Sequence, residues 1–295
     1  MAEKTVYFSG AKTIFFNPVG KICSGQDGAI CGGKIFRFSA KGLCRVFDLN
    51  TFAQTAEFML DKAELIAPHS NAVCFGSEFY EEGDEFPILY TNIYNNYSSA
   101  ADRLEGVCCA YRIWRENGSF ASRLVQMIRV DFVHDSRLWC SETVKDVRPY
   151  GNFAVDAAAN KLHAFVMRDE AHMTRFFRFN LPKAREGVPD DRWGVPVFHL
   201  TAEHIEQQFD ECYVNYMQGA CCHNGILYSV EGFDLPNERA RPAIHIFDTN
   251  AQKLVLEADL EQFGLTREPE FVEVYKDAVY YSDCAGSLFQ VGFGE

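Results

Sequence analysis

The sequence predicts an all-β fold, and three observations support this prediction. Aromatic residues make up 14% of the 295 residues, with 26 Phe and 13 Tyr, and aromatic and β-branched side chains suit the half-buried surface of a sheet. Short apolar runs separated by turn residues recur along the chain, and their order repeats. Helical segments are scarce, the best being Thr201–Phe209, where a threonine precedes Glu and Gln residues.

A repeat organises the chain. Its unit is a strand of small residues, a short turn, an aromatic-rich strand, a second turn, and a strand ending in an aromatic residue followed by Asp or Asn. Two copies, which begin at Gly28 and Gly219, align without a gap through the first hairpin. Three looser copies begin at Asn71, Asn152 and Phe271. The chain is therefore expected to hold five similar units in one domain.

Five such meanders predict a single β-propeller over residues 1–295, with five four-stranded blades. The last copy ends after three strands, which would leave an unpaired edge. The segment Lys12–Asn17 precedes the first copy, so we expect it to complete the last blade and close the ring. Inner strands are crowded near the axis, and they carry Ala29, Ala72, Ala154 and Ala220. The alternatives are a β-sandwich of the same meanders, or six blades with a further hairpin between residues 132 and 148.

The ends of the third strands resemble those of known propellers. The segments Arg45–Asp48 (Arg-Val-Phe-Asp) and His245–Asp248 (His-Ile-Phe-Asp) are similar to the β-propeller superfamily that includes NHL, YWTD and quinoprotein-type blades. The resemblance covers nearly the whole chain. It implies the fold and not a function, because these families include enzymes, receptors and scaffolds.

Two five-bladed families can be compared with this sequence. Five-bladed glycosidases use three carboxylates on successive inner strands, because glycoside cleavage needs an acid together with a base or nucleophile. The first three inner strands here open with Asp27, Asn71 and Asn152, and two amides among three argue against that mechanism. Glutaminyl cyclotransferase-like propellers have about the same number of blades. No signature of theirs can be quoted from this chain, so their activity is not carried over.

The composition excludes several kinds of partner. The formal net charge is -13, and an acidic surface without a basic stripe repels phosphate backbones, so we expect no nucleic-acid partner. No apolar run approaches the roughly 18 residues of a membrane span, so we expect no membrane partner. The first eight residues lack the apolar core of a secretory signal. We expect a cytoplasmic protein, unless a leader has been removed.

The cysteines and histidines show no metal-ligand spacing. Eleven cysteines are present, an odd number in a chain too long to need disulfides. The pairs Cys108–Cys109 and Cys221–Cys222 fall in expected strands, where neighbouring side chains point to opposite faces and do not readily share a metal. His163 and His245 lie on expected strands without a partner at ligand spacing. We therefore expect buried, reduced thiols and neither a metal nor another cofactor.

The long connections of the sequence gather on one face of the expected ring. The loops that enter inner strands and those that join second to third strands share this face, and the long ones are Tyr94–Gly106, Val133–Pro149, Arg168–Thr174, Thr201–Tyr216 and Glu231–Pro242. We expect a polar axial pocket there that binds a small polar ligand, such as a sugar or a carboxylate, or a protein partner. The expected ligand-binding residues are Gln26, Asp27, His69, Asn71, Arg148, Tyr150, Asn152, Arg168, Gln218, Glu231, Glu268 and Glu270.

The alternative function is a hydrolase or lyase that acts on a sugar or lactone at the same axial site. His69 is the only histidine at the start of an inner strand, and Asp27 or Glu270 would orient it as a general base. With Arg168 to stabilise negative charge, the expected catalytic set is His69, Asp27, Arg168 and Glu270. A lone histidine is more often a hydrogen-bonded structural residue, and a ring with a purely structural role is the third interpretation.

Overall fold

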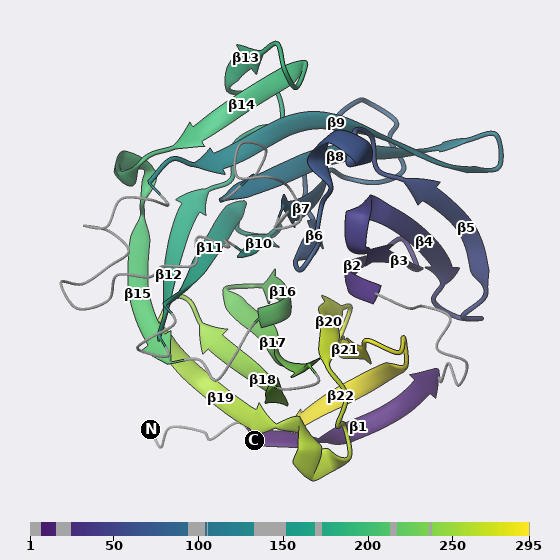
Figure 1. Ribbon diagram of the computed structural model, residues 1–295, viewed down its shortest axis with the longest axis vertical. Coiled ribbons are helices and arrows are strands. Elements are labelled where there is room, and N and C mark those ends of the chain that lie inside the picture. Colours follow the sequence, from purple (N-terminus) through teal and green to yellow (C-terminus); the bar gives the residue numbers. More distant parts are fainter. Residues whose placement is uncertain are drawn as a thin grey trace.

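The strands of the computed structural model form an all-β, propeller-like fold in which curled sheets stand around a common centre (Figure 1). The structure describes residues 7–15, 25–93, 104, 106–132, 152–168, 173–212, 217–235 and 238–294. Among these residues, α1 (Ala63–Ile66) is the only α-helix, and it is a single turn. Within the described residues, no helix has the length and apolarity needed to cross a membrane.

The sheets at the two ends of the chain are each four-stranded. The first has the order β2-β3-β4-β5, with bounds β2 (Gly25–Cys31), β3 (Lys34–Ser39), β4 (Leu43–Asp48) and β5 (Gln54–Met59). The second has the order β1-β22-β21-β20, with bounds β1 (Tyr7–Phe15), β22 (Leu288–Gly294), β21 (Ala278–Asp283) and β20 (Pro269–Tyr275). The strand expected over Lys12–Asn17 thus begins earlier, at Tyr7, and pairs antiparallel with β22.

A six-stranded sheet follows the first in the chain. Its order is β13-β14-β9-β8-β7-β6, with bounds β6 (Val73–Phe75), β7 (Leu89–Ile93), β8 (Val107–Glu116), β9 (Ser119–Val130), β13 (Val188–Asp190) and β14 (Val195–Leu200). The β8–β9 hairpin turns at Asn117 and Gly118, whose φ angles of 48° and 81° suit an Asn-Gly turn. Strand β14 pairs parallel with β9, an extension that the repeat did not predict.

The remaining sheet is eight-stranded, with the order β15-β12-β11-β10-β16-β17-β18-β19. A single parallel bridge, between Asp156 and Cys222, joins its two antiparallel halves. The bounds are β10 (Asn152–Asp156), β11 (Lys161–Arg168), β12 (Met173–Asn180), β15 (Gln207–Cys212), β16 (Met217–His223), β17 (Ile226–Leu235), β18 (Glu238–Asp248) and β19 (Lys253–Asp259). The connection expected over Glu231–Pro242 is therefore largely strand.

The prediction of a helix over Thr201–Phe209 is wrong. Only Ala202–His204 is helical, as one 3-10 turn, and β15 follows it as the outer neighbour of β12. The ring of Phe209 stacks on that of Phe176, with centroids 4.9 Å apart. Pairing with the open edge of β12, together with this aromatic contact, outweighs the weak local preference for helix.

The inner strands are crowded as expected, and the bulky side chains pack farther out. Ala29, Ala154 and Ala220 are fully buried. A Cβ atom at Gly219 would lie only 3.0 Å from the backbone oxygen of Glu270. Farther out, the ring of Phe36 meets three other phenylalanine rings at centroid distances of 5.2 to 5.7 Å. The core thus consists of aromatic layers between neighbouring sheets.

The described cysteines behave as packing residues. The free and buried ones are Cys44, Cys74, Cys108, Cys109, Cys221 and Cys222. Burial raises the pKa of even the less buried Cys31 to about 11, with Glu273 and Glu85 adding to the effect. These thiols are neutral near pH 7, in agreement with the expected packing role.

Candidate functional site

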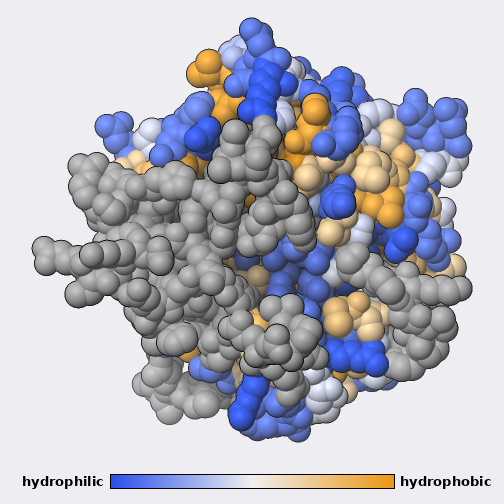
Figure 2. Space-filling view, in the orientation of Figure 1, coloured by the Kyte–Doolittle hydropathy of each residue, from blue (hydrophilic) through white to orange (hydrophobic). Residues whose placement is uncertain are grey.

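The candidate site is the axial mouth, which we define as the starts of the inner strands β2, β6, β10, β16 and β20 with the residues just before them. Figure 2 shows hydrophilic residues gathered at the centre of the face seen in Figure 1. Asn71 Nδ2 donates to Gln218 Oε1 at 3.4 Å, and Gln218 Nε2 donates to Glu268 Oε1 at 2.8 Å. Asn71 precedes β6, Gln218 lies in β16 and Glu268 precedes β20, so three of the expected site residues meet in one hydrogen-bonded chain.

Asp27 lies fully buried at the axial mouth. Its Oδ2 accepts a hydrogen bond from Val73 N at 2.9 Å, and its own backbone N–H donates to Ser70 O at 3.1 Å. Its Oδ1 has no hydrogen-bond partner among the described residues and would lie 3.2 Å from a Cβ at Gly219. One oxygen therefore ties two sheets together, and the other faces across the axis.

Arg37, in β3, places a buried positive charge beside these acids. The side chain is 6% exposed, and its guanidinium carbon lies 4.9 Å from the centroid of the Phe271 ring. Burial lowers the pKa of Arg37, and the charges of Asp27, Glu270 and Asp283 oppose that change. The sequence-based selection used the starts of inner strands and the ends of second strands, such as Arg168, so it missed Arg37, which lies inside the second strand β3.

Burial also changes the protonation of the acids at the mouth. It raises the pKa of Glu270 well above the usual range, and Glu268 adds to the rise while Arg37 opposes it. Burial raises the pKa of Asp27 as well, against the backbone N–H groups of Gly28 and Val73 and the charge of Arg37. Because buried carboxylates outnumber the cations near them, the group retains a proton well above the pH at which a free carboxylate loses it. Such a group can bind hydrogen-bonding ligands or transfer a proton.

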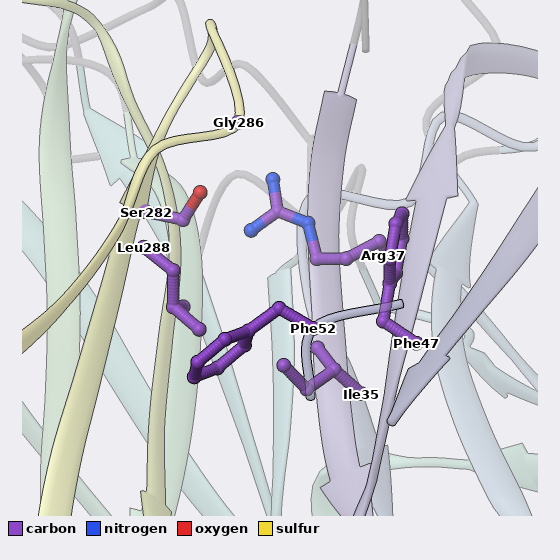
Figure 3. Close-up of a pocket in the computed structure, with 7 residues that line it drawn as sticks. All are labelled: Ile35, Arg37, Phe47, Phe52, Ser282, Gly286 and Leu288. Carbon is purple, nitrogen blue, oxygen red and sulfur yellow. The ribbon is translucent and has the colours of Figure 1, made fainter. Parts of the chain in front are cut away.

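A small cavity of about 30 Å³ lies between the first and last sheets. It is lined by Ile35, Arg37, Phe47, Phe52, Ser282, Gly286 and Leu288. Figure 3 shows the guanidinium of Arg37 directed towards Ser282, above the ring of Phe52. The Nη2 atom of Arg37 has no hydrogen-bond partner among the described residues. The cavity is large enough for one or two water molecules to satisfy it.

His69 is partly buried just before β6. Burial lowers the pKa of His69 to about 4, and neither Asp27 nor Glu270 contributes to this value. A neutral imidazole with so low a pKa is a weak general base at neutral pH. The expected pairing of His69 with one of these carboxylates therefore gains no support.

Two other expected site residues have structural partners. Asn152 is buried and accepts a hydrogen bond at 2.7 Å from Asn92 Nδ2, which links β10 to β7. Glu231 is fully buried with one oxygen 2.8 Å from Nδ1 of His245. Burial alone would lower the pKa of His245, but Glu231 and Glu257 together raise it. The Glu231 carboxylate thus acts within its own sheet, between β17 and β18.

The remaining expected site residues lie in three different settings. Gln26 is buried next to Asp27 at the mouth. Arg168 is the last residue of β11 and pairs through its backbone with Met173. Arg148 and Tyr150 lie outside the described residues. The mouth therefore brings together seven expected residues: Gln26, Asp27, Asn71, Asn152, Gln218, Glu268 and Glu270.

Two further cavities lie away from the mouth. One, of about 230 Å³, is bounded by the far ends of the inner strands, and Glu273 is among its lining residues. Burial raises the pKa of Glu273 to about 8, against backbone hydrogen bonds from Val274 and Ile30. The other, of about 510 Å³, lies where β10 and β11 meet the neighbouring half of their sheet, with Asp156 and His163 in its wall.

No protein-family model matches the chain, and no curated protein matches it in sequence. Among solved structures, it is similar to the crystal structure of Myxococcus xanthus glutaminyl cyclase. The TM-score is 0.48 and the identity 11%, over 98% of this chain and 96% of that chain. Similarity at this level says nothing about the chemistry of this chain.

Proposed function

We propose that the axial mouth binds a small polar ligand rich in hydroxyl groups, such as a sugar. The observation that carries this proposal is a set of buried oxygen atoms without hydrogen-bond partners among the described residues: Gln26 Oε1, Asp27 Oδ1, Asn71 Oδ1 and Glu270 Oε2. A buried acceptor without a donor costs about 1–3 kcal/mol. Ligand hydroxyl groups would supply those donors.

The charge at the mouth favours a neutral ligand over a carboxylate. Besides burial, the charges of Glu268, Asp27 and Asp283 raise the pKa of Glu270, and the charge of Arg37 opposes them. A carboxylate ligand would add one more acid to a group that already binds protons because its charges are poorly compensated, and its charged form would meet repulsion. Of the two small ligands expected from the sequence, a sugar therefore suits the mouth better than a carboxylate.

Calorimetric titration with a panel of mono- and disaccharides tests the proposal. We expect saturable binding of at least one sugar, weakened at least tenfold by Asp27→Asn or Glu270→Gln. The control is Glu82→Gln, because Glu82 is exposed in a turn. Absence of binding across the panel, or equal binding by all variants, would count against a sugar site at the mouth.

A second candidate function is acid–base catalysis of sugar or lactone cleavage at the same mouth. Its support is the raised pKa of Asp27 and of Glu270 beside Arg37, because a carboxyl group that stays protonated near neutral pH can act as a general acid. Chromogenic glycosides and lactones provide the assay. We expect Glu270→Gln to lower kcat at least a hundredfold and Glu82→Gln to leave it unchanged. Sugar binding without turnover would contradict the catalytic function and would support binding as the only function of the mouth.

We propose further that the ring has five four-stranded blades, with β1 as the closing strand. Three considerations support this count. The eight-stranded sheet has two four-stranded halves that share one bridge. The six-stranded sheet is a four-stranded meander plus the added strands β13 and β14. The strand order β1-β22-β21-β20 combines strands from both ends of the chain.

A further inference from the structure

We propose that Asp156, His163 and Cys222 form a binding site for a divalent cation that favours sulfur and nitrogen ligands, such as Zn²⁺. One ligand atom from each residue lies within 4.8 Å of the other two. The three side chains are 1%, 3% and 8% exposed, respectively. Carboxylate, imidazole and thiolate are the three groups that bind zinc in proteins. We call these residues the Asp-His-Cys cluster.

The topology of the sheet assembles the cluster. Asp156 ends β10, and His163 lies on the neighbouring β11, opposite Ala154. Cys222 lies on β16 and is joined to Asp156 by the parallel bridge between the two halves of the sheet. The cluster therefore joins two neighbouring four-stranded units. Its members are 7 to 66 residues apart in the sequence, so no metal-ligand spacing predicted the cluster.

The distances fit a small cation with modest adjustment. Cys222 Sγ lies 3.9 Å from Asp156 Oδ2. A tetrahedral zinc with bonds of about 2.3 Å to sulfur and about 2.1 Å to oxygen needs a sulfur–oxygen separation of about 3.6 Å. The widest separation allowed within the cluster, 4.8 Å, would have to shorten by about 1 Å. The adjoining cavity of about 510 Å³ leaves His163 room for that movement.

The backbone orients the carboxylate of Asp156 in advance. Its Oδ1 accepts hydrogen bonds from Ala158 N and Ala159 N, both at 3.2 Å. Its Oδ2 accepts one from Gly225 N at 2.7 Å. Such outer contacts fix a metal-binding carboxylate and leave a lone pair of Oδ2 facing the thiol. These bonds explain why Asp156 is present, but they do not explain the thiol and imidazole beside it.

The neighbouring cations are already paired with another acid. Lys161 Nζ lies 2.7 Å from Glu206 Oε1, and Arg178 Nε lies 3.5 Å from Glu206 Oε2. When a metal binds, the thiol of Cys222 releases its proton to solvent and sulfur donates the electron pair to the cation. The thiolate and the Asp156 carboxylate then carry two negative charges, which balance a divalent cation.

Three protein ligands leave a fourth position. The cavity beside the cluster also presents Asn224 and Asn250, so a water molecule or an amide oxygen can take that position. An open fourth position is typical of zinc sites that bind an exchangeable ligand. The site is separate from the axial mouth, so its test neither depends on nor decides the proposed sugar binding.

Titration of the full-length protein with Co²⁺, a spectroscopic substitute for Zn²⁺, tests the proposal. We expect about one equivalent to bind and to produce a thiolate-to-cobalt charge-transfer band, which added Zn²⁺ removes. Cys222→Ser should abolish this band. The matched control is Cys31→Ser, which removes a partly exposed thiol outside the cluster and should leave the band intact. A band that survives Cys222→Ser, or no band at all, overturns the site.

A second measurement keeps the proposal testable if Cys222→Ser fails to fold. Anomalous diffraction from crystals of the unaltered protein grown with Zn²⁺ should show a peak between the three ligand atoms. His163→Gln, which keeps a polar side chain of similar size, should weaken Co²⁺ binding at least tenfold while circular dichroism remains native. A zinc peak only at other places, or unchanged Co²⁺ affinity in His163→Gln, refutes the assignment.

Discussion

Arg37 is the residue on which the charge balance of the axial mouth depends. It is buried, and the charges of three nearby acids act on it. Removing one member of a buried ionic group leaves its partners uncompensated in a poorly solvated place. We predict that Arg37→Met lowers the free energy of unfolding by about 3 kcal/mol, measured by urea denaturation at pH 7. The control is Arg241→Met, since the Arg241 side chain is 71% exposed.

A double variant separates charge from packing at this position. Adding Asp27→Asn to Arg37→Met removes one uncompensated acid while keeping an oxygen that can accept from Val73 N. We expect the double variant to recover at least about 1 kcal/mol of the lost stability. If the two substitutions simply add their losses, the guanidinium stabilises the protein by packing and not by its charge.

Glu273 gives a pH dependence whose direction follows from its burial. Its pKa is about 8 in the folded protein against an ordinary value of 4.5, so the folded state binds more protons than the unfolded state between these values. Its contribution to stability is therefore greatest below about pH 4.5 and falls as the pH rises towards 8. Glu273→Gln keeps an acceptor oxygen and has no proton to lose.

We predict that Glu273→Gln gains stability relative to the unaltered protein as the pH rises from 5 to 8. The expected gain is about 2 kcal/mol, below the limit of about 5 kcal/mol that linkage allows, because the side chain is partly exposed at its cavity. Urea denaturation at a series of pH values measures it, with Glu82→Gln as the control. Parallel pH profiles for the two proteins would show that Glu273 is ordinarily solvated.

At the level of the strands, crowding at the axis decides which residues the inner strands tolerate. A Cβ at Gly219 in β16 would meet the backbone oxygen of Glu270 at 3.0 Å and Asp27 Oδ1 at 3.2 Å. Neither the backbone nor an anchored carboxylate yields easily, so we predict that Gly219→Ala costs about 1–3 kcal/mol of unfolding free energy. Gln54→Ala, on the exposed strand β5, should change it by less than about 0.5 kcal/mol. Equal, small losses would mean that β16 and β20 can separate freely.

Local chemistry made the repeated strands predictable. The Asp that ends the third strand of two repeats has a fixed role: Asp48 Oδ1 accepts from Asn50 N and Thr51 N, and Asp248 Oδ1 accepts from Asn250 N and Ala251 N. Such Asx turns depend on a few neighbouring residues, so they leave a mark in the sequence. The small residues of the inner strands can be recognised in the sequence for a similar reason, because each inner strand is equally crowded at the axis.

Contacts between distant segments could not be predicted in this way. Strand β15 exists because β12 offers it an edge, and β14 pairs with β9, which ends at Val130, 65 residues before β14 begins. The same limit holds for the sites. Asp27 and Glu270 stand out at the starts of inner strands, whereas Arg37 and the Asp-His-Cys cluster depend on which side chains neighbouring sheets bring together. Secondary-structure propensity and residue spacing do not reveal which side chains come into contact across sheets.

At the level of the whole molecule, the proposed closure places both ends of the chain in one sheet. Lys12 of β1 lies opposite Gln290 of β22, and both side chains are exposed. Facing residues of antiparallel strands have Cα separations compatible with a disulfide. A bond between these two positions would enclose nearly the whole chain, and it would leave the buried native thiols undisturbed.

We predict that the double variant Lys12→Cys/Gln290→Cys forms this disulfide and unfolds at a higher urea concentration when oxidised. A cross-link around so long a loop removes entropy from the unfolded chain, and we expect a gain of about 3–5 kcal/mol. Reduction should return the midpoint to that of the unaltered protein, and Lys12→Cys alone reveals any coupling to native cysteines. If β1 closes the ring only transiently, the bond forms slowly or joins other thiols. A bond that forms readily but leaves the urea midpoint unchanged would mean that the two ends of the ring separate without limiting unfolding.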